Sequence, residues 1–325
     1  MPDFTDSIKI QNQSLTIQDI EGLLINNINL SFSRIRPIDP RLFSIFDSIE
    51  ELIQEKHNDY IVTTSTYLSR WVGNHNEDLS RLVGKYNAEK IDRDTADFFI
   101  LKVEEQKDNP NKYNIFLVLA LKFGSRWAKY KEPMLISNYK RNFLMLCISK
   151  EVCNKREEIK DIIDQSLSLN AISFDHTLKT DCDDWTNREE AYCKIYKPLK
   201  ALYCNSDYYD SKYRILSDVN LSAFIETSMG SGDQVSHKIV KITQKVYKIL
   251  TIDFLIIDFL GNPVLGIDYH DTEHNIDKHS DNIKRIVLQR AGVPFKIFEN
   301  DRYKQRDVIY EVENCIKQYE KYRVK

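Results

Sequence analysis

Residues 249–270 read ILTIDFLIIDFLGNPVLGIDYH, and this stretch decides the fold. Its two halves, 249–259 and 264–270, are apolar and rich in β-branched residues, which is typical of buried strands. The sequence Gly261-Asn262-Pro263 between them is typical of a turn. The stretch therefore predicts a β-hairpin in the interior of a sheet.

Helix and strand patterns alternate on both sides of this hairpin. Together they give the order α-β-β-β-α-β-α, which predicts an α/β core around a mixed central sheet. The flanking elements are expected at 186–202 (helix), 213–221 (strand), 279–291 (helix, stopped by Gly292), 293–298 (strand) and 304–322 (helix).

The N-terminal half mixes both patterns. Residues 16–35 resemble short strands, and apolar residues at helical spacing predict a helix at 40–56. The turn-rich residues 107–112 separate two apolar runs and predict a second β-hairpin. The stretch 138–168 is expected to be helical and is a candidate oligomerisation element.

The polar segment 173–187 is the best candidate for a linker. We therefore predict two domains. Residues 1–172 would form an α+β domain that selects a substrate or a partner, and residues 173–325 would form the α/β domain.

Composition excludes several classes of protein. The net charge of -3 disfavours a protein that coats nucleic acid by bulk charge, and neither GxGxxG nor GxxxxGK[ST] occurs. The six cysteines form no CxxC pair, which disfavours zinc ribbons and thioredoxin-like sites, so reduced thiols are expected. The polar start and the short apolar runs predict no signal peptide and no membrane segment, so a cytoplasmic protein is expected.

Two carboxylates stand out because they lie inside apolar strands. Asp253 follows Ile252 and precedes Phe254, and Asp268 lies within VLGIDYH. Ionised carboxylates on adjoining buried strands repel each other unless a cation lies between them. Mg²⁺ or Mn²⁺ at Asp253 and Asp268 would relieve that repulsion, although two solvated strand ends would relieve it as well.

A histidine cluster follows directly. His270, His274 and His279 fall within ten residues, interleaved with acids, at a spacing that matches no closed zinc pattern. Imidazole can ligate a metal or move a proton, whereas a solvated polar loop is the simpler interpretation. Three basic residues on the next predicted helix are candidate phosphate contacts or a solvated face: Lys284, Arg285 and Arg290.

At this point the residues resemble a known family. The run I-D-F-L-I-I-D…P-V-L-G-I-D-Y-H-D-T-E-H…S-D-N-I-K-R…A-G-V-P-F-K-I-F at 252–298 is similar to domain of unknown function 2726. That family is placed among the PD-(D/E)XK-type nucleases, near the very-short-patch-repair endonucleases. Its pattern is an Asp-Phe strand, I-E-x-D-x-x-x-H, an Asp with Lys three residues on, and A-G-I/V-P. The matching positions are Asp253-Phe254, His274, Asp281 with Lys284, and Ala291 to Pro294; Asp268 stands in place of Glu and His270 in place of Asp.

The resemblance, which covers about 186–300, implies a restriction-endonuclease-like fold and metal-dependent cleavage of a phosphodiester. It implies that Asp253 and Asp268 hold Mg²⁺ or Mn²⁺. His270 or His274 would handle the proton, and Lys284 would contact phosphate. Arg285 and Arg290 would add substrate contacts, and Glu189 and Asp281 are supporting acids. The implied partner is nucleic acid, DNA in preference to RNA, without a membrane.

Two other readings stay open. The first is a nuclease fold that has lost its chemistry and binds nucleic acid or a protein, with oligomerisation or a partner contact through the N-terminal domain. The second is a small-molecule metalloenzyme that uses Asp268, His270 and His274.

Overall fold

A computed structural model describes part of the chain, and the rest lies outside the described residues. The described residues are 8–10, 13–26, 31–35, 40–64, 97–107, 109–123, 134–138, 141–148, 152, 155–173, 191–203, 213–229, 240, 243–244, 246–247, 250–270, 278–299 and 304–323.

The chain divides into two compact units, and the first is built from both ends of the sequence. Unit 1 comprises Met1–Ile38 and Glu190–Lys325, and unit 2 comprises Asp39–Glu189. The observed units have boundaries at 38/39 and at 189/190, and neither coincides with the division predicted between 172 and 173. Unit 2 is therefore an insertion within the sequence of unit 1.

Unit 1 mixes helices with a four-stranded sheet and two small strand pairs. Its N-terminal elements are β1 Ile8–Ile10, β2 Gln13–Leu15, α1 Ile17–Asn26 and β3 Ser31–Ile35. Its C-terminal elements are η1 Tyr192–Tyr196, α8 Lys197–Tyr203, β9 Tyr213–Asn220, α9 Leu221–Phe224, β10 Ile225–Met229, β11 Thr251–Asp258, β12 Pro263–His270, α11 Lys278–Arg290, β13 Phe295–Glu299 and α12 Gln305–Arg323.

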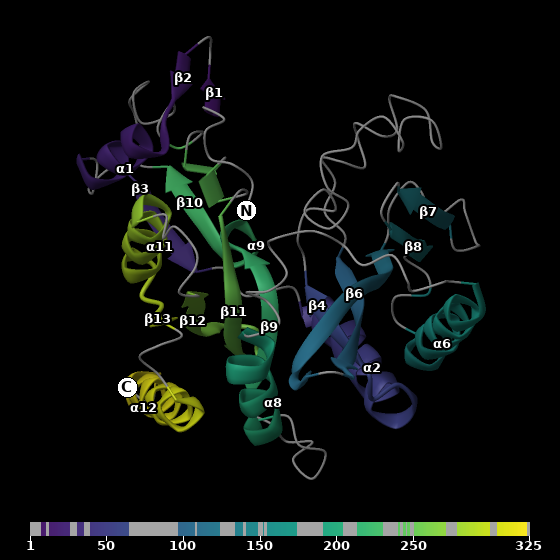
Figure 1. Cartoon of the computed structure of the whole chain (residues 1–325). Helices are drawn as coiled ribbons and strands as arrows, with labels where there is room; N and C mark the ends of the chain where they lie inside the picture. Colours follow the sequence, from purple (N-terminus) through teal and green to yellow (C-terminus); the bar gives the residue numbers. More distant parts are fainter. Residues whose placement is uncertain are drawn as a thin grey trace. The chain divides into compact units, whose positions relative to one another are not determined.

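The four-stranded sheet has the order β13-β12-β11-β9 (Figure 1). β11 pairs antiparallel with both β9 and β12, whereas β12 and β13 are parallel, so the sheet is mixed. Nearly all of β11 and β12 is buried, which fits their almost continuous apolar sequence. The predicted hairpin, its mixed sheet and the α-β-β-β-α-β-α order are confirmed, with α9 and β10 as additional elements.

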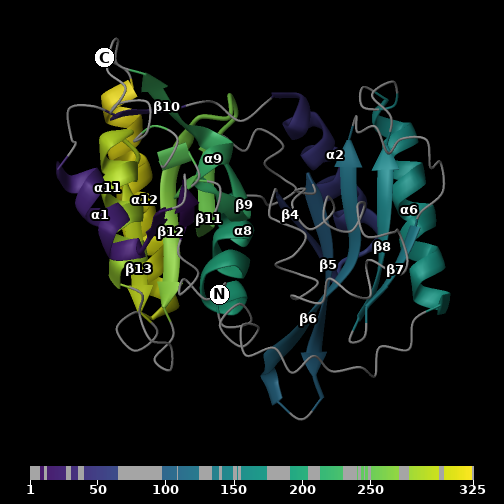
Figure 2. The same cartoon turned by 90° about the horizontal axis from the view of Figure 1, so that it is seen from above.

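The N-terminal segment completes unit 1. β3 pairs antiparallel with β10. Helix α1 packs on α11, and the two helices lie side by side in both views (Figures 1 and 2). The prediction of strands across 16–35 is wrong for α1. Thr16 and Asp19 form a capping box, in which the Asp19 carboxylate accepts the Thr16 amide at 2.8 Å and Thr16 Oγ1 accepts the Asp19 amide at 3.2 Å.

Helix α11 ends where the sequence predicts. Gly292 has a φ of 75°, a conformation that favours glycine. Its amide donates to Gln289 O at 3.1 Å, and the Val293 amide donates to Leu288 O at 2.9 Å, which together form a Schellman motif. This stop turns the chain directly into β13, which lies parallel to β12.

The described residues of unit 2 form a five-stranded mixed sheet and two helices. The strand order is β4-β5-β6-β8-β7, with β6 and β8 parallel and the other neighbours antiparallel. The elements are α2 Pro40–Lys56, β4 Tyr60–Thr64, β5 Phe98–Gln106, β6 Asn109–Phe123, β7 Met134–Asn138, β8 Arg141–Ile148 and α6 Arg156–Ser173.

The sequence predicted α2 and the β5–β6 hairpin correctly, and both are confirmed. The prediction of a helix over 138–168 is wrong for residue 138, which ends β7, and for residues 141–148, which form β8. The apolar run of β8 is short enough to suit either element, and pairing with β6 decides in favour of a strand.

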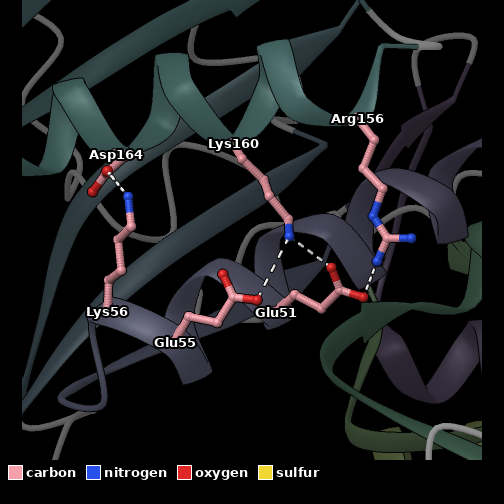
Figure 3. A network of polar contacts seen from close by, with 6 residues as sticks. All are labelled: Glu51, Glu55, Lys56, Arg156, Lys160 and Asp164. Carbon is pink, nitrogen blue, oxygen red and sulfur yellow. Dashed lines mark hydrogen bonds and ion pairs between the residues drawn. The ribbon is translucent and has the colours of Figure 1, made fainter.

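Charged side chains join α2 to α6 in unit 2 (Figure 3). Lys160 Nζ lies 2.7 Å from Glu51 Oε2 and 3.9 Å from Glu55 Oε1. Arg156 pairs with Glu51, and Lys56 with Asp164. These contacts are internal to unit 2 and fix one helix on the other. They form no metal-ligand cluster among the residues that the structure describes.

We expect α1 to contribute to the stability of unit 1. Leu24 is 2% exposed whereas its neighbour Ile25 is 45% exposed. Leu24→Ala should lower the free energy of unfolding by about 2–5 kcal/mol through lost burial and a cavity. Ile25→Ala should change it by less than about 0.5 kcal/mol.

Urea unfolding of the full chain, followed by circular dichroism, measures both effects. Equal losses for the two variants would contradict the docked position of α1, because both side chains would be exposed to solvent on a helix detached from unit 1.

Candidate functional site

The strands β11 and β12 part at two carboxylates. Their described pairing ends at Phe254 and Ile267, and the next residue on each strand is Asp253 or Asp268. Beyond this point β11 continues to pair with β9, and β12 continues to pair with β13. The two acids therefore lie at a fork in the middle of the sheet.

Each carboxylate accepts a backbone N–H from the other strand. The Asp253 amide donates to Asp268 Oδ1 at 3.1 Å, and the Tyr269 amide donates to Asp253 Oδ2 at 2.7 Å. At the fork, carboxylate oxygens thus take the place of backbone carbonyls as acceptors. This arrangement lets two acids remain in a sheet interior where an unpaired carboxylate would be costly.

Lys284 supplies the compensating positive charge. Its Nζ lies 2.6 Å from Asp268 Oδ2, and both side chains are almost fully buried. Burial lowers the pKa of Lys284, but the carboxylates of Asp268, Asp253 and Asp281 raise it by more, so its pKa stands above the ordinary value. The lysine is therefore an ammonium ion at neutral pH.

Asp281 and His270 also lie close to Asp268. Asp268 and His270 are two residues apart on β12, and Asp281 and Lys284 are three residues apart on α11, so each pair shares one side of its element. His270 Nε2 is 3.4 Å from Asp281 Oδ2. Asp268, His270 and Asp281 each offer one ligand atom, and these atoms all lie within 4.8 Å of one another.

The carboxylates around His270 favour its charged form. Burial lowers the pKa of His270, but the Asp281 carboxylate raises it by more, and Asp268 and Asp253 add to that increase, so the pKa stands above 6.5. An imidazole beside three carboxylates can hold a proton, release one, or ligate a cation once it is neutral.

The other predicted site residues lie elsewhere or outside the described residues. Arg285 is exposed on α11. Arg290 Nη2 donates to Leu24 O at 2.7 Å, so its guanidinium holds the end of α1. His274 and Glu189 lie outside the described residues, and their predicted roles stay predictions.

Glu21 of α1 was not predicted, although it contacts the helix that carries the site. Its Oε2 lies 2.5 Å from His279 Nδ1, and its Oε1 accepts Asn282 Nδ2 at 3.0 Å. His279, a predicted member of the histidine cluster, therefore faces α1. A contact between residues 258 positions apart leaves no local signal in the sequence.

Side chains of η1 pack on aromatic residues of the same two strands. The Tyr196 ring stacks on Phe254 with centroids 6.0 Å apart, and Lys194 Nζ lies 6.0 Å from the centre of the Tyr269 ring. Phe254 and Tyr269 each follow one of the fork carboxylates in sequence. Side chains that alternate along a strand point to opposite faces, so η1 buries the face behind the acids.

Comparison with known proteins assigns a family to the C-terminal part of unit 1. The family described as "Protein of unknown function (DUF2726)" matches residues 190–315, which include the fork, α11 and β13. No curated protein and no solved structure matches the chain. The resemblance to this domain is thus confirmed, and the match covers neither the N-terminal segment of unit 1 nor unit 2.

In the part of the chain that the structure describes, no helix combines the length and the apolar character needed to cross a membrane.

We expect the Lys284–Asp268 pair to be strongly coupled. Lys284→Met leaves a buried carboxylate without its cation, and Asp268→Asn leaves a buried ammonium without its anion. Each should lower the free energy of unfolding by about 3–5 kcal/mol. The double variant should lose clearly less than the sum of the two.

A denaturation double-mutant cycle measures this coupling. Lys296→Met is a matched control, because Lys296 pairs with Glu311 at 2.9 Å but both side chains are more than a third exposed. Its loss should stay below about 1 kcal/mol. Additive losses for Lys284 and Asp268 would contradict a direct buried pair.

The raised pKa of His270 predicts a pH dependence of stability. The folded protein binds this proton more tightly than the unfolded chain, whose histidine titrates near 6.5. The stabilisation is therefore complete below about pH 6.5 and is lost as the pH rises through the folded pKa. The groups facing His270 are Asp281, Asp268 and Asp253.

His270→Gln should accordingly destabilise the protein more at pH 6 than at pH 9. Urea unfolding at both values measures the difference. A loss of the same size at the two pH values would show that the proton on His270 adds no stability.

Proposed function

We propose that unit 1 is a metal-dependent nuclease-like unit that hydrolyses a phosphodiester in nucleic acid, DNA in preference to RNA. The observation that carries the proposal is the meeting of Asp253, Asp268 and Lys284 at one point of the sheet. Two acids come from adjoining strands, and the lysine comes from the following helix, 16 residues after Asp268. This is the residue set that the PD-(D/E)XK resemblance implies.

The topology supports the finer assignment to a restriction-endonuclease-like fold. An antiparallel hairpin carries the acids, and the helix α11 connects β12 to the parallel strand β13. This β-α-β connection places the helix against the hairpin. It thereby brings Lys284 and Asp281 to Asp268.

The donor set fits a divalent cation such as Mg²⁺ or Mn²⁺, with Asp268 as the central ligand beside Asp253. A bound divalent ion lowers the pKa of water and stabilises charge on phosphate oxygens. His270 or His274 would orient the attacking water or accept its proton. The Lys284 ammonium holds Asp268 in place and adds positive charge where the phosphate becomes more negative. Arg285, which is exposed on the same helix, would contact phosphate directly.

One observation favours a second candidate, a module that binds nucleic acid without cleaving it. Lys284 already compensates Asp268 at 2.6 Å, so the fork carries its own cation. Such a module would use the exposed Arg285 of α11 for a phosphate contact, and its affinity would fall with salt concentration.

The test is cleavage of single- and double-stranded DNA and RNA by the full chain, with and without Mg²⁺ or Mn²⁺. We expect metal-dependent cleavage that Asp268→Ala abolishes. His270→Gln should reduce the rate by about 10²–10⁴-fold, whether His270 accepts the proton or helps to hold the ion. Glu313→Gln, which changes an acid of α12, is the matched control and should leave the rate unchanged.

Two results would overturn the catalytic proposal. One is cleavage that persists in Asp268→Ala, which would indicate a contaminating nuclease. The other is a wild-type chain that binds nucleic acid in a salt-dependent manner and cleaves none, which would identify the binding module.

A further inference from the structure

The charge balance of the site leaves room for a dication. Three carboxylates, those of Asp253, Asp268 and Asp281, lie near the Lys284 ammonium, so these four groups together carry a formal charge of minus two. Asp268, Asp281 and Lys284 are at least nine-tenths buried. A buried net charge of this size is costly unless it is compensated. One divalent ion beside a neutral His270 would bring the formal sum to zero.

The position of the ligand atoms indicates where such an ion would bind. The ligand atoms of Asp268, His270 and Asp281 lie within 4.8 Å of one another. Donors that share one ion at about 2.0–2.2 Å can be about 4.4 Å apart at most, so small side-chain rotations would suffice. Asp253 is absent from this group, and its Oδ2 accepts the Tyr269 amide.

The identity of the donors indicates which ions would be selected. Mg²⁺ and Ca²⁺ prefer sites made of oxygen alone, whereas imidazole nitrogen suits first-row transition ions. Two carboxylates and one imidazole make a mixed site, and three protein ligands leave further positions for water. From this geometry we infer that Asp268, His270 and Asp281 form a divalent-cation site that selects Mn²⁺-type transition ions over Mg²⁺, and that His270 determines the selectivity.

This inference refines the cation of the proposed function, so its test measures binding and needs no substrate. The full chain, stripped of metal, is titrated at pH 8 by calorimetry with MnCl₂ and separately with MgCl₂. We expect Mn²⁺ to bind at least about tenfold more tightly, following the order of divalent-ion affinities for sites with a nitrogen ligand.

Three variants locate the site. His270→Gln should weaken Mn²⁺ about tenfold or more and remove the preference over Mg²⁺, because the nitrogen ligand is lost. His270→Asp, which makes all ligands oxygen, should shift the preference toward Mg²⁺. Asp281→Asn should weaken both ions.

His57→Gln is the matched control. His57 Nε2 lies 2.8 Å from Asp164 Oδ1 in unit 2, so it is likewise a histidine paired with an aspartate. Its substitution should leave both affinities unchanged. Pulsed electron paramagnetic resonance on the Mn²⁺-loaded wild type should detect an imidazole nitrogen bound to the ion, which keeps the inference testable if a variant fails to fold.

Unchanged Mn²⁺ affinity in His270→Gln, or no nitrogen coupling in the wild type, would overturn the inference. If a chain with either result still cleaves nucleic acid, the proposed reaction is supported and this metal site is not. Selective, His270-dependent Mn²⁺ binding by a chain that cleaves nothing would support the site and remove the reaction.

Discussion

At the fork between β11 and β12, Asp268 accepts the backbone amide of Asp253, and Asp253 accepts the backbone amide of Tyr269. This pair of hydrogen bonds determines what surrounds the fork. It gives each carboxylate one hydrogen bond but supplies no formal charge. A buried carboxylate also needs a cation, and Lys284 provides it at 2.6 Å from Asp268. The rotation of α11 about its axis is thereby fixed, because only one side of the helix carries both Lys284 and Asp281.

The position of α11 is fixed a second time from outside the sheet. Glu21 holds His279 and Asn282, and Arg290 holds the last turn of α1 through Leu24 O. Contacts at the first and last turns of α11 therefore tie it to α1, while Lys284 ties it to the strands. The family match begins at residue 190, yet the helix that completes this arrangement lies within the first 26 residues of the chain.

The sequence predicted those parts of the fold whose signals are local. The hairpin, α11 and its stop at Gly292 follow from apolar patterns and turn residues over a few positions. The strands predicted across 16–35 are wrong for α1, whose start is marked by the capping box of Thr16 and Asp19. The run at 138–148 was assigned to a helix because a short apolar stretch does not distinguish the two elements until its partner strand is known.

The sequence likewise predicted those site residues whose signals are local. Asp253 and Asp268 were identified because charged residues are rare inside apolar strands. The pairing of Lys284 with Asp268, and the approach of Asp281 to His270, depend on how α11 returns across the sheet. Glu21 could not be predicted, because unit 2 separates it in sequence from every residue it contacts on α11.

The insertion of unit 2 has a consequence for the order of events during synthesis. Ile20 and Leu24 are buried in the finished protein, but α11 and β10 emerge from the ribosome only after the whole of unit 2. Unit 2 is continuous in sequence and can form its own sheet before residues 190–325, which pack against the first 38 residues, have been synthesised. Unit 1, whose pairings span the greatest distances along the chain, therefore folds last, and with it the site between β12 and α11. A chain interrupted before α11 would carry a folded unit 2 and a nascent α1 with its apolar side exposed.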